Sequence, residues 1–265
     1  MQNLSVQGKH IRTSAAALIV LGLLAISRSS AAAEVISLGA AENVTIFAGS
    51  TVSNSGPTIV VGNLALGPGL SVTGFPPGKV IGGSIHINDA LATKAHADAS
   101  AAYAQLVGET LTSDLSGQNL GGMILTPGVY HFGSAAQLTG ILILDTGGDP
   151  NAAFHFQIGT TLTTAIGSAI TLLNGNSINI FWQVGTSATI GAGSGFYGNI
   201  LADQSLTIDN GAVVNGRAMA INGAVTLDHG RIIGFGVPEP SSWAMITIGA
   251  ALLFAVLRLS PTRKT

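Results

Sequence analysis

The sequence predicts a mainly β fold, a solenoid of short strands with one α-helix beside it, and three observations support this prediction. The chain has 265 residues, of which 36 are glycine, and only 5% are aromatic, so it turns often and packs small side chains in layers. Short apolar runs recur with glycine or asparagine between them. Several similar fragments also recur along the second half of the chain.

The repeated fragments define the expected coil. Gln157–Thr163 is followed by the similar Gln183–Thr189. Ser205–Thr207 repeats the end of that fragment, and Ala224–Thr226 repeats it again. The spacing of about 18 to 26 residues predicts a solenoid with roughly three short strands per coil. Because side chains alternate along a strand, the middle residue of each small-apolar-small triplet should point inward and its neighbours outward.

Residues 88–107 interrupt the β pattern and predict an amphipathic helix. The segment contains eight alanines, and Asn88 or Asp89 can serve as its N-cap. One stripe along it consists of Leu91, Ala95, Ala99, Ala102 and Leu106. Since alanine-rich helices need a packing partner, we expect this helix to lie along one face of the solenoid.

Residues 1–33 have the pattern of a secretory signal peptide. Lys9 and Arg12 precede an apolar run from Ser14 to Ile26, and three alanines at 31–33 precede Glu34. A membrane anchor is the alternative, although this apolar run is short for a bilayer. We therefore expect an exported chain that begins at Glu34.

The last segment, residues 237–265, resembles the PEP-CTERM sorting signal of Gram-negative bacteria. Its motif Pro238-Glu239-Pro240 precedes an apolar stretch, about 243–259, that predicts a transmembrane helix, and basic residues follow. The resemblance implies recognition by an exosortase-type sorting enzyme at the membrane, cleavage near the motif, and delivery to the cell surface or the extracellular space. An ordinary C-terminal membrane anchor is the alternative.

Composition excludes several classes of function. Four basic residues lie between Glu34 and Gly236, against eleven acidic ones, so the chain offers no electrostatic footprint for nucleic acid. The chain has no cysteine, which excludes disulfides and thiolate metal sites.

A carbohydrate-active β-helix enzyme would require clustered carboxylates. The aspartates here are spread over the chain and are interpreted as turn residues: Asp145, Asp149, Asp203, Asp209 and Asp228. The sequence therefore predicts no catalytic residues.

Two other groups of residues are assigned structural roles. His131 and His155 are each followed by phenylalanine and occupy like positions in successive repeats, so we expect a stacked surface pair in adjacent coils instead of a metal site. Gly191–Gly195 lacks the following helix that a phosphate-binding loop needs and is interpreted as a solenoid turn. No metal and no other cofactor are expected.

A set of ordered motifs spans Glu34 to Ile233. They are Leu38–Asn43, Phe47–Asn54, Gly62–Leu64, Val72–Gly78, Leu125–Tyr130, Gly148–Ala152, Asn179–Val184 and Val214–Ala218. These motifs closely resemble the microbial ice-binding protein family. The resemblance implies that residues 34–236 form a discontinuous β-solenoid of triangular cross-section with the helix alongside. It also implies adsorption to an ice crystal surface without catalysis, and we expect a monomer.

Ice binding calls for a flat, rigid and weakly polar face of small side chains. A first ladder of small-apolar-small triplets, each with a glycine two residues before it, matches positions where the family tends to carry threonine. Its outward residues are Thr51, Ser53, Ser71, Thr73, Ala169, Thr171, Gly195 and Asn215. Tyr197 and Val213 depart from the pattern, and a tyrosine there would hold ice away from the face.

A second ladder is more regular in threonine and is the alternative face. It consists of Thr161, Thr163, Ser187, Thr189, Ser205, Thr207 and Thr226. If the helix covered this side, the ladder could not meet ice. A different function also remains open: a cell-surface or matrix protein could use the same solenoid for adhesion or spacing, with no affinity for ice.

Overall fold

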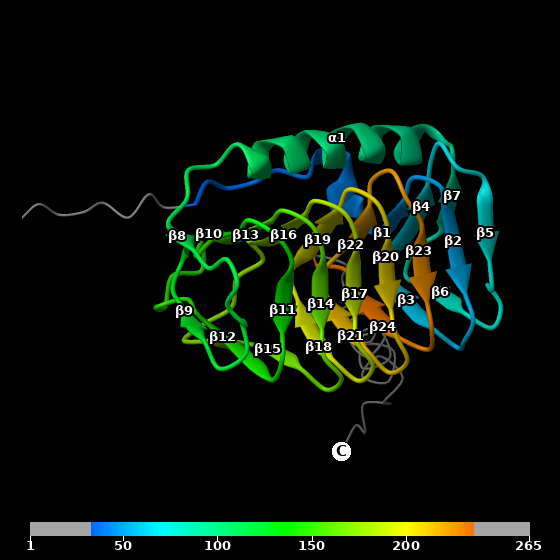
Figure 1. The fold of residues 1–265 in the computed structure, drawn as a ribbon. Helices are drawn as coiled ribbons and strands as arrows, with labels where there is room; N and C mark the ends of the chain where they lie inside the picture. The colour runs from blue at the N-terminus through cyan, green and yellow to red at the C-terminus, as the bar shows by residue number, and fades with distance from the viewer. Residues whose placement is uncertain (1–32, 236–265) are drawn as a thin grey trace, which may run out of the picture.

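The computed structural model describes residues 33–235, which wind into a solenoid of parallel strands with helix α1 along one side (Figure 1). Each coil passes through three sheets in the same order, here named A, B and C, so the solenoid has three sides. This confirms the predicted β-solenoid with one long helix packed alongside.

The strands are given in their spatial order within each sheet. Sheet A contains β7 (Ile85–Ile87), β4 (Asn63–Leu66), β1 (Val44–Ala48), β22 (Ala218–Ala220), β19 (Asn199–Ala202), β16 (Ile180–Val184), β13 (Phe154–Ile158), β10 (Gly128–Phe132) and β8 (Ser113–Asp114). Sheet B contains β11 (Ala136–Leu138), β14 (Leu162–Thr164), β17 (Ala188–Ile190), β20 (Leu206–Ile208), β23 (Val225–Leu227), β2 (Thr51–Asn54) and β5 (Ser71–Thr73). Sheet C contains β6 (Lys79–Ile81), β3 (Ile59–Val61), β24 (Arg231–Ile233), β21 (Val213–Asn215), β18 (Gly195–Tyr197), β15 (Ala169–Leu173), β12 (Ile141–Asp145) and β9 (Ile124–Leu125).

The strand registers confirm the predicted repeat. Gln157 pairs with Gln183, and Thr189 pairs with Thr207, so like positions of successive repeats lie side by side. The central residue of the predicted triplets points inward, as in Val52, which is fully buried. Alternation of side chains along each short strand therefore separates core residues from surface residues.

The stack is discontinuous in sequence. The first coil, β1–β3, lies between the last coil, β22–β24, and the second coil, β4–β6. Each strand of the first coil pairs with one strand from the end of the fold and with one from its beginning. The solenoid therefore closes only when both halves of the chain are present.

Helix α1 (Ala90–Val107) carries the chain from β7, at one end of sheet A, to β8, at the other end. Its 18 residues cover about 27 Å. The helix predicted over 88–107 is confirmed, and Asp89 is its N-cap, because the carboxylate accepts a hydrogen bond from Ala92 N at 2.9 Å. A short 3-10 helix, η1 (Gly39–Asn43), packs against α1, where Ala40 N donates to Asp98 Oδ2 at 2.8 Å.

Two hydrophobic cores stabilise the fold. The first fills the solenoid, where the rings of Phe156 and Trp182 stack with centroids 3.7 Å apart. The second lies between α1 and the outer side of sheet A. The helix contributes Ala92, Ala95, Ala99, Ala102 and Leu106 to it, so the predicted stripe is correct except that Ala92 is buried and Leu91 only partly so.

Glycine is required where successive coils touch at the corner between sheets A and B. A Cβ at Gly185 would lie 2.2 Å from the carbonyl oxygen of Gly159. At the corner between sheets B and C, Gly193 adopts a φ of +64°. The predicted turn at Gly191–Gly195 is therefore confirmed.

Arg217 joins the two ends of the chain within the fold. Its guanidinium is buried and donates to the carbonyl oxygens of Glu42 at 2.6 Å and Phe235 at 3.0 Å, and to Asn199 Oδ1 at 3.1 Å. Burial lowers the pKa of Arg217. Residues 34–235 contain all three sheets and both hydrophobic cores, so we expect this segment to fold on its own.

The helix interface predicts a large effect of Leu106→Ala. Leu106 is fully buried against sheet A, so its truncation should lower the free energy of unfolding by about 2–5 kcal/mol. Val107→Ala is the matched control: this side chain is 53% exposed, and the change should stay within about 0.5 kcal/mol. Urea unfolding of both variants measures the difference, and equal losses would contradict the packing of α1.

The N-cap predicts a pH-dependent contribution from Asp89. The N–H of Ala92 and then His86 lower the pKa of Asp89, so its charge stabilises the fold above about pH 3.9, and this stabilisation is lost as the pH falls through the lowered pKa. Asp89→Asn keeps a capping oxygen without the charge. In thermal unfolding between pH 2 and 6, the melting temperature of the wild type should exceed that of the variant only at the higher pH. A constant difference would argue against this role.

Candidate functional site

The first predicted ladder does not form one face. Thr51, Ser53, Ser71 and Thr73 lie on β2 and β5 of sheet B. Its other members, Ala169, Thr171, Gly195 and Asn215, lie on β15, β18 and β21 of sheet C. The prediction of a single ladder is wrong because small-apolar-small triplets follow both corners of the coil, and the two kinds look alike in sequence.

The side chains that broke the predicted pattern belong to sheet C. Tyr197 is on β18, and its ring contacts that of Phe235 with centroids 5.2 Å apart. Burial raises the pKa of Tyr197. Val213 begins β21 of the same sheet. Neither residue stands on sheet B, so neither interrupts its surface.

Sheet B joins the second ladder to the remaining part of the first. Thr163 pairs with Thr189, and Thr207 pairs with Thr226. Thr226 then pairs with Ser53 across the junction of the two halves of the chain. The threonine column, in spatial order, is Gln137, Thr163, Thr189, Thr207, Thr226, Ser53 and Thr73.

A second column runs beside it, two residues earlier along the chain in each coil. Thr51 and Ser71 are paired directly, and backbone hydrogen bonds such as Leu162 N to Ser187 O, 3.2 Å, connect the other coils. The serine column, in the same order, is Ala135, Thr161, Ser187, Ser205, Ala224, Thr51 and Ser71. Together the two columns place all seven residues of the second predicted ladder on one face.

This face is regular and uncharged, and none of the described elements covers it. Parallel strands hold successive side chains of a column about 4.8 Å apart. Apart from Gln137 at one edge, both columns contain only threonine, serine and alanine. Among residues 33–235, the hydroxyls of Thr163, Thr189 and Thr207 have no hydrogen-bond partner, which leaves them available to water.

The other two sheets differ in character. Helix α1 covers sheet A, as Figure 1 shows along the top of the solenoid, and leaves sheet B free. Sheet C presents the outward charges of Lys79 and Arg231, and some of its outward side chains are large and apolar, such as Ile124, 62% exposed, and Ile141, 54% exposed. Sheet B is therefore the one regular array of small side chains among the three.

The aspartates lie at or beside turns, as predicted, and Asp145 is the last residue of β12. Asp145 Oδ1 accepts from Gly147 N at 2.9 Å, and this hydrogen bond is the main cause that lowers the pKa of Asp145. Asp149 Oδ1 accepts from Asn151 N at 2.8 Å. The remaining three lie at coil corners, Asp203 before sheet B and Asp209 and Asp228 after it.

The predicted histidine pair is wrong. His131 pairs with Gln157, whereas His155 pairs with Val129, so the two histidines are out of register by two residues. His155 is fully buried beneath α1, where its Nδ1 lies 2.6 Å from Glu109 Oε2. The repeated His-Phe dipeptide suggested equivalence, but the strand register assigns the two positions differently.

Some predicted features lie outside the described residues. These are the signal peptide up to residue 32, the motif Pro238-Glu239-Pro240 and the apolar stretch about 243–259. Within residues 33–235 there is no cluster of three or more His, Asp or Glu side chains suited to a metal ion. The same residues contain no helix that is long and apolar enough to cross a membrane.

Comparison with known proteins agrees with this architecture. The profile of the family described as ice-binding-like matches residues 46–233, which is most of the chain. The chain belongs to the ice-binding-like family. Among its relatives in that family, an ice-binding protein of Nostoc sp. (strain HG1) is 46% identical over 252 residues, covering 89% of this chain and 93% of that protein.

Solved structures of the family have the same fold. An ice-binding protein from the Antarctic ascomycete Antarctomyces psychrotrophicus superposes with a TM-score of 0.72 at 39% identity, covering 76% of this chain and 98% of that one. An ice-binding protein from an Antarctic biological consortium superposes with a TM-score of 0.73 at 42% identity, covering 76% of this chain and 92% of that one. These likenesses establish the family architecture for the described solenoid.

The sequence alone missed three members of the face. Gln137, Ala135 and Ala224 join the columns through strand register. A signal existed for Ala224, which precedes Val225-Thr226 as Ser205 precedes Leu206-Thr207. No hydroxyl marked Ala135, so only the stacking of β11 on β14 places it there.

Proposed function

We propose that this protein adsorbs to ice through sheet B and thereby inhibits ice growth or recrystallisation, without catalysing a reaction. The observation that carries the proposal is the array on sheet B, in which seven paired strands present two columns of small, uncharged side chains. The ice-binding names of its relatives support the same reading.

Adsorption to ice depends on how the face orders the water next to it. Charged groups would orient neighbouring water around themselves, whereas threonine offers one hydroxyl and one methyl group on a short stem. Its β-branched side chain is stiff at χ1, so little rotamer freedom is lost on contact with a crystal. Rigid strands repeat this group at a fixed spacing, which allows the bound waters to adopt an ice-like arrangement.

Export completes the proposal. Residues 1–33 act as a cleaved signal peptide, and the motif Pro238-Glu239-Pro240 directs the chain to an exosortase-type enzyme. The apolar stretch about 243–259 serves as a transient membrane anchor. The mature domain then acts as a monomer at the cell surface or outside the cell, needs no cofactor or metal, and binds no nucleic acid.

A substitution in the centre of sheet B tests the face. The test protein comprises residues 34–235. In it, Thr207→Tyr places a large ring in the threonine column, so it should abolish most thermal hysteresis and recrystallisation inhibition. Thr171→Tyr is the matched control on sheet C and should retain activity.

The outcomes separate the alternatives. Loss of activity in both variants, with the fold intact by circular dichroism, would contradict sheet B as the single face. Loss only in Thr171→Tyr would move the site to sheet C. An inactive but folded parent would instead favour an adhesive or structural solenoid of the cell surface or matrix.

A further inference from the structure

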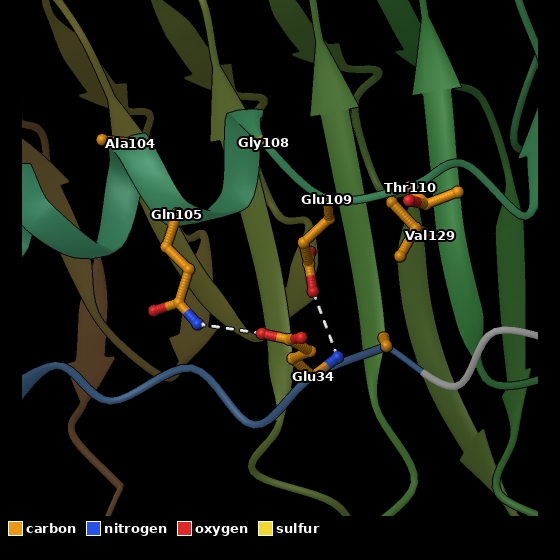
Figure 2. A pocket seen from close by; sticks show the side chains of 8 residues that line it. Glu34, Ala104, Gln105, Gly108, Glu109, Thr110 and Val129 are labelled. Atoms are coloured by element: carbon orange, nitrogen blue, oxygen red, sulfur yellow. Dashed lines mark hydrogen bonds between the residues drawn. The ribbon is translucent and has the colours of Figure 1, made fainter.

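The segment that precedes the solenoid is packed between α1 and sheet A. Ile36 and Leu38 are buried in the second core, at 4% and 2% exposure. On one side of these residues, Ala40 N is bound by Asp98 of the helix. On the other side, Glu34 lies at the C-terminal end of α1 (Figure 2), so the helix holds this segment at both ends.

Glu109 binds the N-terminal segment at that end of the helix. Its side chain is only 6% exposed, and its Oε2 accepts a hydrogen bond of 2.6 Å from Nδ1 of the fully buried His155. Its Oε1 accepts a hydrogen bond of 3.1 Å from the backbone nitrogen of Glu34, drawn as a dashed line in Figure 2. Gln157 Nε2 donates to Glu109 O at 3.1 Å and to Leu106 O at 2.7 Å, which fixes the backbone.

The nitrogen that Glu109 binds is the one that signal-peptide cleavage would release. Hydrolysis of the Ala33–Glu34 amide adds water across the C–N bond. Ala33 keeps the new carboxylate, and the Glu34 nitrogen becomes an amine that is protonated near neutral pH, because α-amino groups ordinarily titrate at about 7.7–8.0. A neutral amide with one N–H is thereby replaced by an ammonium group with three.

We propose that the α-ammonium group of Glu34, formed by cleavage after Ala33, pairs with the carboxylate of Glu109 and locks the N-terminal segment onto α1. The proposal rests on the predicted cleavage position and goes beyond ice adsorption. It assigns to Glu109 the role of a receptor for the processed N-terminus.

The charges around this position favour an ammonium group. Two carboxylates, those of Glu34 and Glu109, line the same pocket. Gln105 Nε2, which is neutral, lies 3.5 Å from Glu34 Oε2, and His155 faces Glu109 from sheet A. The other lining residues, Ala33, Ala104, Gly108, Thr110 and Val129, are uncharged. A cation here balances carboxylate charge, and its hydrogen bond to a carboxylate is stronger than that of an amide.

The lock has a defined dependence on pH. Pairing with Glu109 raises the pKa of the Glu34 α-amino group above its unfolded value. Its stabilisation is therefore complete below about pH 7.7 and is lost as the pH rises through the raised pKa.

Two matched chains test the proposal. The first begins at Glu34 and ends at residue 235, and the second carries one additional residue, Ala33, which moves the ammonium group about 3.8 Å along the chain while keeping an amide at Glu34. Carbon-13 reductive methylation labels the α-amine, and Lys79 and Lys94 are the two internal references. NMR titration should show the α-amine of the Glu34 chain titrating about half a pH unit or more above that of the Ala33 chain.

Unmodified protein provides the second readout. The melting temperature of the Glu34 chain should exceed that of the Ala33 chain by about 2 °C at pH 6, and the difference should disappear by about pH 10. In the background of Glu109→Gln, both the titration difference and the thermal difference should vanish. Because each comparison is made between two chains of the same background, a general loss of stability in Glu109→Gln does not affect the result.

Two results would overturn the proposal. One is an equal titration midpoint and melting temperature in the Glu34 and Ala33 chains. The other is a first residue other than Glu34, found by N-terminal sequencing of the protein that is exported when the full-length precursor is expressed. Neither depends on ice activity, so this lock and the proposed function can fail separately.

Discussion

The in-register stacking of very short parallel strands is the constraint on which the rest of this structure depends. A strand of three residues has one residue of opposite orientation at its centre, so a shift by one residue would exchange core and surface along an entire sheet. The core prevents that shift, because Val52, Leu162 and Leu206 are fully buried at matching positions. The same register lines up the threonine and serine columns, so the packing that stabilises the solenoid also forms this face.

The discontinuous topology places further demands on the helix. Because β1 stacks on β22, the chain must travel from the end marked by β7 to the end marked by β8 before the second half can form. Helix α1 makes this connection and covers sheet A, which leaves sheet B as the regular uncovered face. The N-terminal segment and Glu109 then close the side of the helix, where Glu109 Oε2 lies 2.6 Å from Nδ1 of the buried His155.

Much of this architecture could be predicted from sequence. The repeat spacing, the inward centre of each triplet and the helix over 88–107 follow from local patterns, and the structure confirms them. The assignment of triplets to sheets could not be predicted, since Thr171 and Thr163 have similar neighbours but follow different corners of a coil. Ser53 joins Thr226, far away in sequence, only because the chain returns to the middle of the stack. His155 was misplaced for the same reason, because its neighbours are set by register.

The most direct test of the central claim uses the absence of cysteine from the chain. Single cysteines at Thr207 on sheet B, Thr171 on sheet C and Ala97 on the exposed side of α1 can each carry the same bulky maleimide label. The fraction of labelled protein incorporated into slowly growing ice is then measured. The account predicts that the label at Thr207 excludes the protein from ice, while labels at Thr171 and Ala97 leave incorporation unchanged. Incorporation of the Thr207-labelled protein at the level of the other two would contradict it.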